Sequence, residues 1–190
     1  MLGIGLGVQR GGASPRKKLF TDVNIAQPAT DYFRGYSVEG GSITFTADQT
    51  IGGASGWLKG QFPGTNQSAP SGITVLNIAD TGDVRKGMLF KVEFDIFLET
   101  AANWTEGSET TSNIAISFGN TTTNVDLTPD QTVHVTMTPK ACDLDAAINT
   151  SFNDLILFFN AENQTPEANA KFYIKNFEFR LGNDSTLVTG

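Results

Sequence analysis

The chain is short of the residue types that build disulfide frameworks, metal centres and catalytic triads. It has one cysteine, Cys142, and one histidine, His134. A single thiol excludes an intramolecular disulfide, and a single imidazole leaves a histidine-based metal site or triad without partners. Cys142 also has no basic neighbour in sequence that would favour its thiolate. We therefore expect a protein that is not an enzyme, with no catalytic residue, no bound metal and no cofactor.

Long apolar runs are missing too, and basic residues are scarce outside one segment. No stretch of about 18 apolar residues exists, so we expect no membrane span. The first residues lack the basic region of a signal peptide. Because the fold needs no disulfide, it can assemble in a reducing cytoplasm. Residues 1–18 carry a charge of +4, and the remaining residues carry −11. Because phosphate neutralisation needs lysine and arginine on the binding face, this acidic body argues against nucleic acid as a ligand.

What the chain does have is the composition of short strands joined by turns. It contains 20 Gly and 14 Phe but only 2 Trp. In residues 89–99, Val92, Phe94, Ile96 and Leu98 alternate with mainly charged residues. A period of two places one face on a core and the other in solvent. This stretch predicts a strand with one face on the core and one face in solvent.

A second stretch near the C-terminus predicts the strand that closes the fold. In residues 171–181, Phe172 and Ile174 share one phase, while Phe177, Phe179 and Leu181 share the other. One extra residue, as in a β-bulge, would restore the register. We therefore expect a bulge at 175–176 that keeps all the phenylalanines inward.

Further strands are expected at 42–46, 57–62, 73–78, 114–118 and 133–137, with a hairpin turn at Gly119-Asn120. The continuous apolar run 155–159 predicts a strand buried on both faces. Nine or ten short strands predict an all-β antiparallel sandwich, or jelly roll, with an extended N-terminal arm. The expected organisation is an anchor arm over residues 1–18, a sandwich domain over 19–181 and a C-terminal tail over 182–190.

The N-terminal segment has the pattern of a strand that binds a tight surface. Leu2, Ile4, Leu6 and Val8 alternate with glycines, which allow close backbone approach. Basic residues follow at Arg10, Arg16, Lys17 and Lys18. The segment is either a disordered tail or an anchor that orders on a partner, and we favour the anchor. In that interpretation the aliphatic residues bind a neighbouring subunit and the basic ones pair with its acidic surface.

Sugar binding would need exposed aromatic platforms beside polar groups. The candidates are Trp104, in a polar loop, followed by Trp57 and Tyr36. A loop tryptophan can equally be a lid on the core or an interface anchor. A turn with Asp80, Thr81 and Asp83 offers oxygen ligands for Ca²⁺, although the EF-hand spacing is absent.

Residues 90–98 and 172–181 together resemble the central and closing strands of carbohydrate-binding-module-like, galactose-binding-like jelly rolls. The resemblance lies in Phe-Tyr-Ile-Lys-Asn-Phe-Glu-Phe-Arg at 172–180. It implies a sandwich over about residues 19–181. Lys175 stands where that family often has an acidic residue, which speaks against the family's structural cation site.

The opening Met-Leu-Gly-Ile-Gly-Leu-Gly-Val-Gln-Arg-Gly-Gly resembles the first residues of tailed-bacteriophage virion proteins, which dock on the particle. The two resemblances imply a virion component, either a head decoration, a head fibre or a tail protein, that assembles in the host cytoplasm. Its partners would be other virion proteins and copies of itself, a trimer being one such assembly. The alternative is a carbohydrate-binding module that recognises host-surface glycans.

Overall fold

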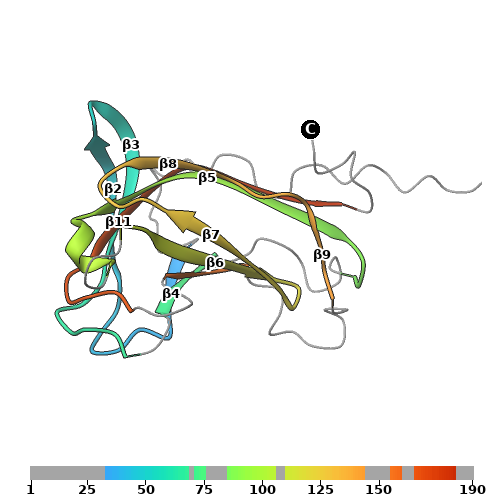
Figure 1. The fold of residues 1–190 in the computed structure, drawn as a ribbon, viewed down its shortest axis with the longest axis horizontal. Coiled ribbons are helices and arrows are strands. Elements are labelled where there is room, and N and C mark those ends of the chain that lie inside the picture. Colours follow the sequence, from blue (N-terminus) through green and yellow to red (C-terminus); the bar gives the residue numbers. More distant parts are fainter. Residues whose placement is uncertain are drawn as a thin grey trace, which may run out of the picture.

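The structure is a computed structural model that describes residues 33–68, 71–75, 85–105, 110–143, 155–159 and 165–182. These residues form two antiparallel sheets packed face to face (Figure 1). The predicted arm at 1–18 and residues 183–190 of the predicted tail lie outside the described residues. The observed architecture confirms the predicted all-β jelly-roll sandwich.

We call the two sheets sheet A and sheet B, each in its spatial order. Sheet A consists of β2 (Thr44–Ile51), β3 (Ala54–Gln61), β11 (Lys171–Gly182), β5 (Leu89–Glu99) and β8 (Thr132–Thr136), with β9 (Lys140–Ala141) also paired to β5. Sheet B consists of β1 (Phe33–Tyr36), β4 (Ser71–Val75), β10 (Leu155–Phe159), β6 (Ser112–Phe118) and β7 (Thr121–Leu127). A short 3-10 turn, η2 (Ala101–Asn103), follows β5.

Strand β5 lies between β11 and β8 in sheet A, and it has the one buried face that its alternation predicts. Every second side chain from Phe90 to Leu98 is buried, and those between are half-buried. Each large apolar side chain taken from water contributes about 1.5–3 kcal/mol. Because a one-residue slip would turn all of them outward, this row fixes the register of β5 against β8 and β11.

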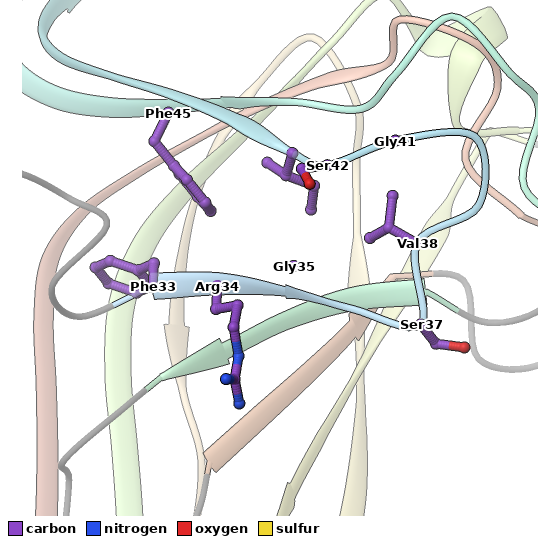
Figure 2. A pocket seen from close by; sticks show the side chains of 9 residues that line it. Phe33, Arg34, Gly35, Ser37, Val38, Gly41, Ser42 and Phe45 are labelled. Carbon is purple, nitrogen blue, oxygen red and sulfur yellow. The ribbon is translucent and has the colours of Figure 1, made fainter.

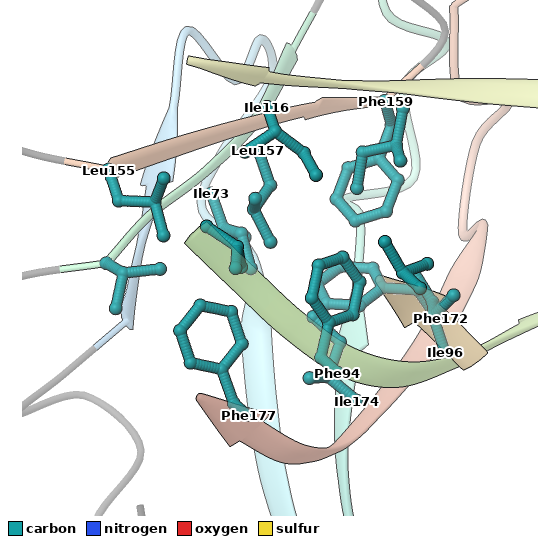
Figure 3. Packing of buried hydrophobic residues seen from close by; sticks show 14 of the residues in the cluster. Ile73, Phe94, Ile96, Ile116, Leu155, Leu157, Phe159, Phe172, Ile174 and Phe177 are labelled. Atoms are coloured by element: carbon teal, nitrogen blue, oxygen red, sulfur yellow. The ribbon is translucent and has the colours of Figure 1, made fainter. Parts of the chain in front are cut away.

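The predicted bulge in β11 is confirmed. Pairing between β11 and β5 shifts between Lys175 and Glu178, and Asn176 has a φ of 53°. The extra residue restores the inward phase, so Phe177 is buried and stacks on Phe94 at 5.6 Å between ring centroids. Figure 3 shows both rings facing Ile73 and Leu157 of sheet B. The core is therefore a layer of interlocking rings and aliphatic side chains between the two sheets.

In sheet B, the predicted hairpin between β6 and β7 is present. Gly119 and Asn120 both have positive φ, 56° and 60°, as a tight two-residue hairpin turn requires. The prediction for β10 is wrong in one respect. Leu155, Leu157 and Phe159 are buried, but Ile156 and Phe158 are only half-buried. The apolar run therefore has one face on the core and one apolar face on the outside of the sandwich.

Candidate functional site

Trp104, the first glycan candidate from the sequence, lies in the core. Its ring is 1% exposed and packs against Phe159 and Phe62, with centroids 5.4 and 6.1 Å away. The indole Nε1 donates a hydrogen bond to the Glu99 carbonyl at 3.1 Å. Trp104 is therefore a lid on the core, which is the alternative to a sugar platform, and its ring is not presented to a ligand.

Trp57 is also buried, although it lies on the outer side of sheet A. It is 3% exposed, and the Lys175 Nζ lies 5.6 Å from its ring centroid, as a cation–π contact. The Trp57 Nε1 has no hydrogen-bond partner among the described atoms. This ring offers no open platform either.

Tyr36 differs from both tryptophans because it is open to solvent. It is 39% exposed, which makes it the exposed large apolar side chain of the described residues. Its ring meets that of Phe158 edge to face, with centroids 5.2 Å apart and planes at 89°. This contact holds the two rings at a fixed angle on the outer side of sheet B.

The rings belong to a surface that we call the Tyr36 face, the outer side of sheet B. Cross-strand pairing sets two rows of residues across all five strands. The first row is Tyr36, Gly72, Phe158, Ala115 and Asn124. The second row is Arg34, Thr74, Ile156, Ser117 and Thr122, and Asn113 pairs with Asp126 at one end. The face thus combines an aromatic and aliphatic strip with amide, hydroxyl and charged groups.

Glycine at position 72 lets the strands under the two rings approach closely. A Cβ added there would lie 1.9 Å from the Leu157 carbonyl oxygen and 2.9 Å from the Phe158 Cα. Both atoms are backbone and cannot swing away. Gly72 therefore allows Tyr36 and Phe158, which pair with it from either side, to meet over it.

The end of β1 beside Tyr36 is fixed by one buried glutamine. Gln67, 3% exposed, accepts a hydrogen bond from the Glu39 N–H at 2.7 Å. Its Nε2 donates to the carbonyls of Thr65 at 2.8 Å and Glu39 at 3.2 Å. These bonds join the segment after Tyr36 to residues 65–67, so the edge of the face is ordered before any ligand arrives.

A cleft of about 560 Å³ opens on the other side of β1, between β1 and the start of β2. Its lining includes Phe33, Val38, Ile43 and Phe45. Figure 2 shows the Arg34 side chain leaving β1 on the side away from these apolar groups. The cleft and the Tyr36 face are therefore two surfaces that share β1 as a border.

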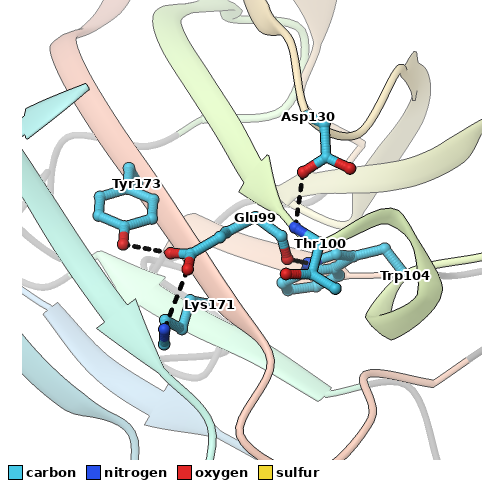
Figure 4. A network of polar contacts seen from close by, with 6 residues as sticks. All are labelled: Glu99, Thr100, Trp104, Asp130, Lys171 and Tyr173. Atoms are coloured by element: carbon cyan, nitrogen blue, oxygen red, sulfur yellow. Dashed lines mark hydrogen bonds and ion pairs between the residues drawn. The ribbon is translucent and has the colours of Figure 1, made fainter. Parts of the chain in front are cut away.

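The outer side of sheet A carries charged groups, but many of them are already bound within the protein. Glu99 accepts hydrogen bonds from the Tyr173 hydroxyl and, at 3.0 Å, from the Lys171 Nζ (Figure 4). Asp130 accepts from the backbone N–H of Thr100 at 2.7 Å in the same view. Lys91 pairs with Glu93 at 2.6 Å. Many polar groups on this side are therefore already hydrogen-bonded or paired within the protein, which leaves fewer of them to bind a ligand.

These contacts shift two pKa values in opposite directions. Burial raises the pKa of Glu99, but the hydrogen bonds from Tyr173 and Lys171 outweigh it, and the net pKa is lowered. Burial, together with the bond to Glu99, raises the pKa of the Tyr173 hydroxyl. The Glu99 carboxylate and the neutral Tyr173 phenol therefore stabilise each other.

The chemically reactive residue types lie apart. His134 points outward from β8, and its Nδ1 lies 2.7 Å from the Asp95 Oδ1. Cys142 is buried, and burial raises its pKa to about 11, which disfavours the thiolate. Glu93 and Asp95 share the outer face of β5, where they bind Thr136 and His134. In the part of the chain that the structure describes, no group of three or more His, Cys, Asp or Glu side chains could hold a metal ion.

Several predicted sites fall on residues outside the described ranges. These are the anchor residues Leu2, Ile4, Leu6, Val8, Arg10, Arg16, Lys17 and Lys18, and the oxygen ligands Asp80, Thr81 and Asp83. Within the described ranges, no helix has the length and apolar content needed to cross a bilayer.

Comparison with known proteins gives structural neighbours only. No family model matches the chain, and no curated protein matches it either. Among solved structures, the chain is similar to the N-terminal cellulose-binding domain of Cellulomonas fimi β-1,4-glucanase C, at 14% identity and a TM-score of 0.43, over 82% of this chain and 89% of that one. It is similar to a CBM4 module at 12% identity and a TM-score of 0.47, over 80% of this chain and 95% of that one. It is also similar to a CBM28 module specific for non-crystalline cellulose, at 14% identity and a TM-score of 0.46, over 86% of this chain and 96% of that one.

Proposed function

We propose that this chain binds carbohydrate, without catalysis, on the Tyr36 face. The observation that carries the proposal is the solvent-open ring of Tyr36, held edge to face by Phe158 on a face whose strands β6 and β7 carry hydroxyl and amide side chains. The apolar side of a sugar ring stacks on an aromatic platform, and its hydroxyls need hydrogen-bonding groups within reach. The Tyr36 face offers both, and the Gln67 bonds reduce the ordering cost of binding.

The opposite sheet supplies a matched control. Phe97 and Tyr173 form a similar aromatic pair on the outer side of sheet A, with centroids 5.9 Å apart. We expect Tyr36→Ala to weaken binding to soluble oligosaccharides about tenfold or more, because it removes the platform. Phe97→Ala should leave the affinity unchanged. Titration calorimetry against a panel of α- and β-linked oligosaccharides measures both, and equal losses in the two variants would contradict the proposal.

A second function is compatible with the first and concerns where the module is displayed. We propose that residues 1–18 dock the protein on a bacteriophage particle as an oligomeric virion component. The support is the sequence of the arm, with its alternating aliphatic residues and its charge opposite to that of the body. Deleting residues 1–18 should leave a folded domain that no longer joins particles. Undiminished incorporation of the shortened protein would contradict this role.

A further inference from the structure

Arg34 is the basic side chain of the Tyr36 face, and it is exposed. Among the described residues, no hydrogen bond or ion pair engages its guanidinium. It points out of sheet B, away from the cleft beside β1 (Figure 2). Arg34 lies two residues before Tyr36 on the same strand, and side chains so spaced share one face about 6–7 Å apart. That spacing is comparable to the length of a sugar unit.

A guanidinium in this position has a specific chemical preference. Its planar fork of donors matches a carboxylate with two parallel hydrogen bonds, which a lysine cannot reproduce. Building on the carbohydrate-binding function above, we propose that the Tyr36 face selects acidic glycans, with Arg34 binding the carboxylate of an acidic sugar while the adjacent sugar stacks on Tyr36. From Arg34 the row continues to its pairing partner Thr74, and from there to Ile156 on β10, the central strand of sheet B.

The charge around the site limits the kind of acidic glycan. The chain carries a net charge of −7, and Asp126 is exposed on β7, the strand at the opposite edge of sheet B. Four strand spacings separate β1 from β7, or about 19 Å. An oligosaccharide with a carboxylate on every sugar would extend across the face, and Asp126 and the net negative charge of the protein would repel it. The preferred ligand therefore carries an isolated acidic unit among neutral ones.

The test compares each oligosaccharide with a form of itself in which one sugar is oxidised to a carboxylate, using the full chain. We expect the acidic form to bind roughly fivefold tighter, the size of an exposed charge pair, with a preference that falls as salt is added. Arg34→Gln should abolish the preference, and Arg34→Lys should retain part of it. Lys59→Gln removes the same charge from sheet A and should retain all of it.

The other outcomes separate this inference from the function on which it rests. If neutral and acidic forms bind equally to the wild type and to Arg34→Gln, the acidic preference is refuted and carbohydrate binding stands. If neither form binds, carbohydrate binding itself is refuted. If poly-glutamate displaces the acidic oligosaccharide at equal carboxylate concentration, Arg34 marks a general anion surface, which also overturns the inference.

Discussion

Replacing Gly72 with alanine tests how the Tyr36 face is built. The added Cβ would lie 1.9 Å from the Leu157 carbonyl oxygen and 2.8 Å from its carbonyl carbon. This clash can be relieved only if β4 and β10 move apart, because both contacts are with backbone atoms. That movement strains the ladder from Leu155↔Val75 to Phe159↔Ser71. Overpacking costs about 1–3 kcal/mol, and each weakened backbone hydrogen bond adds about 1 kcal/mol. We expect a total loss of about 3 kcal/mol.

The assay is thermal unfolding followed by circular dichroism. For a domain of this size, a loss of about 3 kcal/mol lowers the Tm by roughly 6–12 °C. The control is Gly64→Ala, since a Cβ at Gly64 would meet only the Asn169 side chain at an ordinary 3.9 Å. It should change the Tm by no more than about 2 °C. A Gly72→Ala protein as stable as the control would refute the close approach of β4 and β10.

Two further predictions concern the residues around the end of β5. Trp104→Phe should destabilise the fold by about 1–2 kcal/mol in urea unfolding, because the Glu99 carbonyl loses its indole donor, yet leave oligosaccharide affinity unchanged. A loss of affinity without a loss of stability would instead make Trp104 a platform. Glu99→Gln tests the lowered pKa of Glu99. A carboxyl with a depressed pKa stabilises the fold above its ordinary value of 4.5, and this contribution disappears as the pH falls through the folded-state pKa. The wild type should therefore lose more stability than Glu99→Gln on acidification below 4.5, and parallel curves would contradict the shift.

The strands with clean periodicity could be predicted from the sequence. Alternation in β5 and the phase change in β11 are local signals, and both identify which side chains face the core. The hairpin after Phe118 is equally local, because Gly119 and Asn120 favour positive φ. These elements were enough to predict a sandwich.

The Tyr36 face could be predicted only in part, because it depends on pairing between distant strands. The sequence identifies Tyr36 as an aromatic candidate, but its partner Phe158 lies far along the chain and meets it across Gly72. The run Leu155–Phe159 is apolar throughout, so periodicity cannot distinguish a strand buried on both sides from one with an apolar outer face. The sequence suggests an exposed ring at Trp104 because the residues around it are polar. In the structure, that ring packs against Phe159 in the core.

The bulge at Asn176 makes the length of β11 as important as its composition. If Asn176 stayed in the chain but the bulge were lost, the two halves of the strand would stay in opposite phases. Phe177, Phe179 and Leu181 would then face water, and Glu178 and Arg180 would face the core. Deleting Asn176 would instead put the apolar side chains of both halves in one phase, and a regular strand without a bulge could keep them all inward. In divergent relatives, the spacing between Ile174 and Phe177 and the presence of the bulge should therefore change together.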